Sequence, residues 1–195
     1  MDGVGAVAVH SCTAVGHNAL SGSLTAGAVS STAVGRAALK SLTSGAQNTA
    51  VGANCADDLT TGGYNTAVGK STLASLTTGS HNIGLGRATF NTAADDESNN
   101  IAIGNSALGA AKQDGTVSST NREVKENIAI GVDALIGGTL TGTNHLEGNI
   151  AIGHQAMDAT GANNQIGTIA IGTSALGALT SGVDNLAIGY QALDA

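Results

Sequence analysis

Residues 65–73 read Asn-Thr-Ala-Val-Gly-Lys-Ser-Thr-Leu, and residues 186–193 read Leu-Ala-Ile-Gly-Tyr-Gln-Ala-Leu. Both are copies of one short unit, x-Ala-(Val/Ile)-Gly-x-x-Ala-Leu, which recurs along the chain. Its glycine, called here the anchor glycine, stands at Gly16, Gly35, Gly52, Gly69, Gly86, Gly104, Gly131, Gly153, Gly172 and Gly189. The intervals are 19, 17, 17, 17, 18, 27, 22, 19 and 17 residues. A short period repeated this often predicts a repeat array whose units stack on one another.

Two apolar columns accompany the anchor glycines. Val, Ile or Leu stands one residue before each glycine, and mostly Leu stands four residues after it. In a parallel stack, side chains at equivalent positions of neighbouring coils pack on one another. These columns therefore predict an all-β fold, a parallel β-solenoid. Residues 1–195 would form a single array of about ten coils of 17–19 residues, with two longer insertions. Glycine every few residues disfavours a helix.

Alanine forms a third column, two residues before the anchor glycine, with Gly84 as the one exception among ten copies. This column alternates with the Val/Ile column along the strand, so the two lie on opposite faces. A strand that is apolar on both faces is buried on both sides. We expect one side to be the coil interior, and the shallow alanine side to be covered by another copy of the same chain.

Asparagine recurs four residues before the anchor glycine. The column consists of Asn48, Asn65, Asn82, Asn100, Asn127, Asn149 and Asn185. Stacked amides can hydrogen-bond along a parallel array, and Asn also tolerates the left-handed backbone of a tight corner. We interpret the column as a structural ladder, with a polar ligand-binding row as the alternative.

Two segments, 109–127 and 137–148, break the period and are predicted to be inserted loops, which in solenoids often emerge on a binding face. The candidate surface-binding residues are Arg36, Lys70, Arg87, Lys112, Arg122 and Lys125. The first three directly follow anchor glycines. They would lie on an exposed face and could form a basic stripe for a polyanionic glycan of a host surface.

Composition excludes several classes of function. The formal charge is −7, which makes nucleic acid a poor partner, because phosphate binding needs a basic surface. No apolar run of about 20 residues exists, so we expect no membrane insertion. Two cysteines, Cys12 and Cys55, are too few for a disulfide framework and are interpreted as small buried thiols.

Three places in the sequence carry residue types that could bind a metal ion. His10, Cys12 and His17 lie close in sequence and could gather around a threefold axis, although no recognised zinc spacing is present. Residues 57–58 and 95–97 are acidic and could hold calcium through oxygen ligands. We interpret these acidic runs as solvated corners and predict no metal site.

Residues 63–71 nearly spell a phosphate-binding loop, but five residues separate the glycines where four are needed. No nucleophile with a partnered base is apparent either. We therefore expect no cofactor and no enzymatic activity.

The repeats carry a family likeness. Residues 65–69, 100–104 and 186–193 resemble repeats of phage tail-fibre proteins and the head repeats of trimeric (YadA-like) autotransporter adhesins. The resemblance covers nearly the whole chain and implies a left-handed β-roll, three chains around one axis, and spacer or attachment duty. No signal peptide, stalk heptads or membrane anchor is visible, so a virion appendage fits better than a complete autotransporter. The last coil stops uncapped after Leu193, so we expect other fibre or virion proteins to dock at the ends.

The function predicted from these observations is a homotrimeric structural fibre or adhesin segment of a virion appendage, a phage tail or head fibre outside the cell. A bacterial surface adhesin head is one alternative. An ice-binding solenoid is another, since Thr13, Thr32, Thr49 and Thr66 form a threonine column, but only one column wide. A glycan-cleaving fibre would need a carboxylate pair, and none is identifiable.

Overall fold

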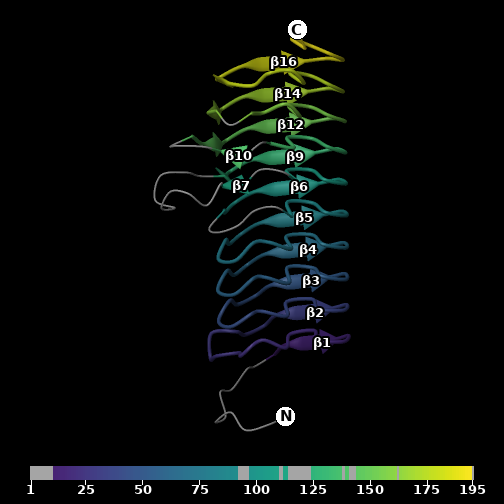
Figure 1. Ribbon diagram of the computed structural model, residues 1–195, viewed down its shortest axis with the longest axis vertical. Helices are drawn as coiled ribbons and strands as arrows, with labels where there is room; N and C mark the ends of the chain where they lie inside the picture. Colours follow the sequence, from purple (N-terminus) through teal and green to yellow (C-terminus); the bar gives the residue numbers. More distant parts are fainter. Residues whose placement is uncertain are drawn as a thin grey trace.

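The computed structural model describes residues 11–91, 97–109, 112–113, 124–137, 139–140, 144–161 and 163–194. They form an elongated stack of flat coils, with one parallel sheet running the length of the stack (Figure 1). No helix occurs among the described residues. The prediction of an all-β, parallel β-solenoid is therefore confirmed.

The long sheet contains one strand from each copy of the repeat. Its strands are β1 (Thr13–Val15), β2 (Thr32–Val34), β3 (Thr49–Val51), β4 (Thr66–Val68), β5 (Ile83–Leu85), β6 (Ile101–Ile103), β9 (Ile128–Ile130), β12 (Ile150–Ile152), β14 (Ile169–Ile171) and β16 (Leu186–Ile188). Neighbouring strands pair in a register that places equivalent residues of consecutive repeats opposite each other, such as Ala33 and Ala50. The register holds across the longest interval, where Ile103 pairs with Ile130.

Two smaller sheets lie beside the long one. A four-stranded parallel sheet contains β8 (Val124–Lys125), β11 (Leu146–Glu147), β13 (Gln165–Ile166) and β15 (Gly182–Val183). A two-stranded parallel sheet pairs β7 (Lys112–Gln113) with β10 (Thr139–Leu140). The segments 109–127 and 137–148 are thus partly built into sheets, and the two of them pair with each other.

The alanine column faces the interior of each coil, where Ala33, Ala50 and Ala102 are completely buried. The opposite wall of the coil meets it closely. A Cβ built on Gly84, the exception in this column, would lie 2.6 Å from Cγ2 of Thr72. Beside Thr72 the gap between the walls is therefore too narrow even for an added methyl group. The prediction that another copy must cover the alanine side is wrong, because the chain covers its alanines itself.

Away from the anchor glycines the coil is deep enough for large side chains. Leu73, Phe90 and Leu135, four residues after their glycines, are fully buried. A corner glycine borders this interior. A Cβ on Gly79 would collide with the carbonyl oxygen of Glu97 and lie 2.6 Å from Cδ1 of Leu76, so this corner has no room for a side chain.

The corners combine glycines with left-handed residues. All ten anchor glycines have φ between 129° and 143°, a region that L side chains rarely adopt. From Gly16 to Gly172, an added Cβ would also collide with the carbonyl group of the anchor glycine one coil on. At the asparagine corner the left-handed residue is the one before Asn, such as Tyr64 (φ 61°) or His81 (φ 61°). The expectation that Asn supplies this conformation is wrong.

The asparagine column forms a buried ladder of amide hydrogen bonds. Asn82 Nδ2 donates to Asn65 Oδ1 at 3.1 Å, and Asn100 Nδ2 donates to Asn82 Oδ1 at 3.1 Å. The amides from Asn48 to Asn149 also donate to a backbone carbonyl across the coil, as Asn82 does to Glu97 at 2.8 Å. The ladder weakens at Thr168, whose hydroxyl lies 3.5 Å from Asn185 Nδ2. Buried amides satisfied in this way fix the register of neighbouring coils.

Candidate interaction surface

The outward face of the long sheet is mostly apolar, with Val, Ile or Leu on every strand. Because the middle residue of each strand points inward, the first and third residues point outward. We call these twenty side chains the apolar strip. Val51, Val68 and Ile83 are 37%, 39% and 38% exposed, and most of the others in the middle coils are half-buried. Nine strand spacings of about 4.8 Å make the strip about 43 Å long.

The strip changes composition along the rod. In β1 to β4 its two columns are Thr and Val, and from β6 to β14 both columns are Ile. The threonine column itself is one residue wide, and a Val column lies beside it on the same face, because Thr and Val are two residues apart in each strand.

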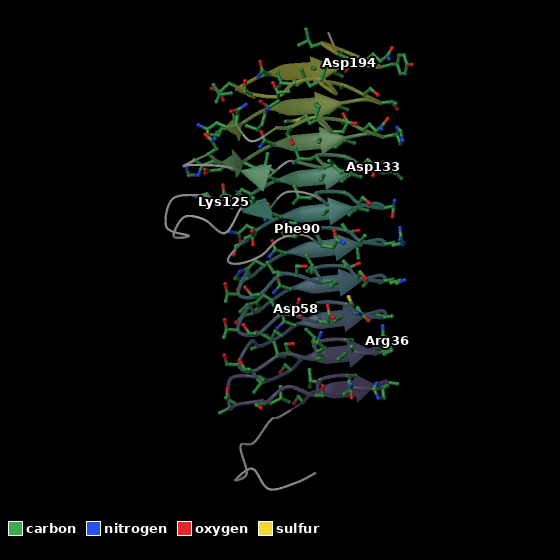
Figure 2. The ribbon with its side chains drawn as sticks, in the orientation of Figure 1. Arg36, Asp58, Phe90, Lys125, Asp133 and Asp194 are labelled. Atoms are coloured by element: carbon green, nitrogen blue, oxygen red, sulfur yellow. The ribbon has the colours of Figure 1, made fainter. Side chains whose placement is uncertain are left out.

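A second exposed row follows the corner beside the strip. It consists of the residues directly after the anchor glycines, and Arg36, Lys70 and Arg87 are exposed there, as predicted. Figure 2 shows Arg36 at the right-hand edge of the lower half of the rod. Arg36 Nη2 donates to Asn54 Oδ1 at 2.6 Å. Among the described residues, none of the three cations pairs with a carboxylate.

The other predicted surface-binding residues do not join this row. Lys125 belongs to β8 in the four-stranded sheet, and its Nζ lies 3.4 Å from Glu147 Oε1. Figure 2 places Lys125 on the opposite side of the rod from Arg36. Lys112 lies in β7, and Arg122 lies outside the described residues. The six candidates therefore do not form one site.

The candidate metal ligands are separated or occupied. Asp57 is buried, and Lys40 Nζ lies 3.0 Å from it and 3.6 Å from Asp58. The hydrogen bond to Asp57 raises the pKa of Lys40. Cys12 Sγ donates to the Ala28 carbonyl at 3.3 Å. Within the described part of the chain, no three His, Cys, Asp or Glu side chains are grouped to hold a metal ion. His10, Asp95 and Asp96 lie outside the described residues.

The second thiol is enclosed in the coil. Cys55 is completely buried at a position where most repeats carry Ala, and its Sγ donates to the Ala67 carbonyl at 3.2 Å. Burial raises the pKa of Cys55 to about 12. A thiol in this state is unreactive, which fits a packing role.

Sequence reasoning missed the outward orientation of the Val/Ile column. The available signal was the alanine three residues after most anchor glycines, as at Ala38 and Ala107, which matches the small residue of the facing wall. Two small columns facing each other indicate a thin interior, from which larger side chains are excluded.

The fold and its surface define a class, a β-solenoid of short repeats with a continuous outward apolar strip. A search against protein-family models, curated proteins and solved structures finds no match to this chain. The described residues also contain no helix that is long and apolar enough to cross a membrane.

Proposed function

We propose that this chain is a structural, non-catalytic segment of a homotrimeric fibre, part of a virion appendage such as a phage tail or head fibre. Each strand of the long sheet marks one of about ten coils of a left-handed roll. The fibre spaces its parts and attaches to a host surface. The observation that carries the proposal is the apolar strip, which the coil does not need for its own interior.

The strip supports self-association because its rows are evenly spaced. The coil interior is already filled by Ala, Leu and the Asn ladder, so Ile at both outward positions of four strands adds nothing to the core of a single chain. Long contiguous apolar surfaces mark interaction sites. A second strip with the same spacing of about 4.8 Å fits parallel and in register. The number three comes from the resemblance to trimeric fibre and adhesin heads.

Charge gives the assembly a salt dependence. Residues 92–195 carry three basic and eleven acidic residues, a net charge of −8. Parallel chains bring these acidic halves together, and their repulsion is screened by salt. Added salt should therefore strengthen the trimer.

Light scattering coupled to size exclusion tests the proposal. The chain should elute at micromolar concentration as a particle of three 18.8 kDa subunits. The Ile130→Glu/Ile152→Glu double variant should be monomeric with an unchanged β-sheet signal by circular dichroism. Ser181→Glu, at an exposed site outside the strip, should remain trimeric. A monomeric wild-type chain would refute the assembly.

A second candidate function has its own observation. The two-column array of Thr and Val over β1 to β4 is a flat, regular surface of the kind an ice-binding solenoid would use. Thermal hysteresis in a monomeric preparation would favour this alternative. A trimer without hysteresis would dispose of it.

A further inference from the structure

The row of residues after the first five anchor glycines is held straight by the backbone. It consists of His17, Arg36, Ala53, Lys70 and Arg87, and we call it the basic edge. The next residue on each following coil donates its backbone N–H to a carbonyl of this row, as Asn54 does to Arg36 at 2.8 Å and Ala88 does to Lys70 at 2.9 Å. The row therefore repeats at the strand spacing and spans about 19 Å.

Within the described part of the chain, the cations of the basic edge have no carboxylate as a counter-ion. Lys70 and Arg87 occupy neighbouring coils, where like charges repel. Elsewhere in the described chain, Lys40 pairs with Asp57 and Lys125 pairs with Glu147. None of the described residues supplies a carboxylate to Lys70 or Arg87. An uncompensated row of positive charge on a chain of net charge −7 indicates a ligand that carries the missing negative charge.

The groups beside the cations are neutral hydrogen-bonding groups. Asn18, Asn54 and Ser71 stand two residues after their anchor glycines and are exposed or half-buried. Asn54 already accepts from Arg36, which orients the guanidinium along the edge. Amides and hydroxyls suit sugar hydroxyls, while Arg and Lys suit carboxylate, sulfate or phosphate groups.

We infer that the basic edge binds a linear anionic polysaccharide laid along the rod. The inference rests on the attachment role proposed above and names the ligand class. A linear chain fits because the charges lie on one line, one or two strand spacings apart. A nucleic acid duplex is disfavoured, because it would also approach the acidic half of the rod. Three edges per trimer would add avidity.

The ligand should occupy only the N-terminal part of this corner. Further along the same row stand Asn105, Val132, His154, Thr173 and Tyr190, which include no Lys or Arg. Asp133 lies beside Val132, and Figure 2 shows Asp133 on the same side of the rod as Arg36, in the upper half. The change of charge therefore sets where the polysaccharide ends.

Calorimetric titration of the full chain with dextran sulfate tests the inference, with neutral dextran and poly-L-glutamate as comparison probes. Dextran sulfate should bind and neutral dextran should not. The logarithm of the binding constant should fall with the logarithm of salt concentration with a slope of about −2 to −3. The Lys70→Gln/Arg87→Gln variant should bind at least about tenfold more weakly, with a slope nearer −1.

The matched control separates the edge from net charge. Lys70→Gln and Lys125→Gln change the charge equally, but only Lys70→Gln should weaken binding, by about threefold. Equal losses from the two variants, or no binding of dextran sulfate, would overturn the inference. Poly-L-glutamate binding as tight as that of dextran sulfate would overturn the polysaccharide class.

Light scattering on the same samples separates this inference from the assembly. If the chain is a trimer but does not bind dextran sulfate, only the ligand inference is refuted. If the chain is a monomer that binds dextran sulfate, only the trimer is refuted. The two proposals also predict opposite responses to salt.

Discussion

The lower and upper parts of the rod share one interior and differ on the outside. Residues 11–91 form coils at intervals of 17 to 19 residues, with Thr and Val on the first four strands of the strip and an exposed row of cations. Residues 97–194 form coils at intervals of up to 27 residues, with mostly Ile on the strip and two extra sheets beside it. The net charge is +1 over residues 1–91 and −8 over residues 92–195.

This difference shows which positions the fold dictates. The anchor glycines and inward-facing alanines run almost unchanged through both parts, because the corner and the thin interior admit nothing larger. The outward positions vary because the coil closes without them. We therefore assign structure to the constant columns and interaction to the varying ones, which gives predictions for each.

The largest effect should come from the anchor glycines, and it should be equal in the two parts. Gly69→Ala and Gly131→Ala each place a methyl group against the carbonyl of the next anchor glycine, at a positive φ that alanine rarely adopts. We expect each to cost more than about 4 kcal/mol of unfolding free energy. Urea unfolding followed by circular dichroism measures this.

Gly189→Ala is the matched control, because no described backbone atom lies close to a Cβ added there. It has φ 129°, but the nearest atom to an added Cβ is 3.9 Å away. Strain alone should cost about 1–3 kcal/mol. An effect as large as that of Gly69→Ala would show that the collision between coils is not the cause.

Substitutions in the asparagine ladder should give the second-largest loss of unfolding free energy. The loss should be larger for Asn82, in the lower part, than for Asn185, in the upper part. Asn82→Ala removes an acceptor used by Asn100 and leaves the buried Glu97 carbonyl without the amide N–H. We expect a loss of about 3 kcal/mol. Asn185→Ala should cost less than about 1 kcal/mol, since its contacts to Thr168 are 3.4 and 3.5 Å. Equal losses in urea unfolding would contradict the ladder as a source of stability.

The strands and their pairing could be predicted from the sequence because both depend on period alone. Once Ala33 and Ala50 occupy equal places in consecutive copies, a parallel stack brings them opposite each other. The repeat motif resumes after each insertion, so Ile103 pairs with Ile130 across the longest interval. No knowledge of side-chain packing was needed for this part.

The sequence could not show which face of the strand points inward. The alternation of Ala with Val or Ile places them on opposite faces but does not show which face lies inside the coil. That choice depends on the distance between the two walls of a coil, which only the fold shows. The basic edge was easier to predict, since Lys70 and Arg87 follow glycines that the period already aligned. That none of the described carboxylates pairs with these cations could not be predicted, because partners such as Asp57 for Lys40 come from a neighbouring coil.

The thiols should report on opening of the lower part alone, since both lie there. Because burial raises the pKa of Cys55 to about 12 and encloses its Sγ, folded Cys55 should react much more slowly than a free thiol at pH 8. We expect a thiol reagent to label Cys55 at lower urea than the loss of the whole β-sheet signal, because the Thr/Val part of the strip is less apolar. Simultaneous transitions would show that the rod unfolds as one unit.

The Cys55 thiol should also make the free energy of unfolding depend on pH. The folded state holds the Cys55 proton more tightly than the unfolded state, so its stabilising effect is complete below pH 9 and declines towards pH 12. Cys55→Ala fits a position that is usually Ala and should remove this part of the alkaline loss. An unchanged pH profile in unfolding experiments would mean that Cys55 does not contribute.

The smallest effect should be a gain, obtained by making the upper part of the ladder resemble the lower. Thr168→Asn supplies an amide between Asn149 and Asn185, where contacts of 3.4 and 3.5 Å replace the 3.0 to 3.1 Å bonds found elsewhere. One or two better buried hydrogen bonds should add about 1 kcal/mol and raise the Tm by about 2–4 °C. Thr180→Asn makes the same change at an exposed corner and should leave the Tm unchanged. If Thr168→Asn instead lowered the Tm, the space around residue 168 would fit threonine better than asparagine. Local packing in the upper part would then explain why the asparagine ladder is interrupted there.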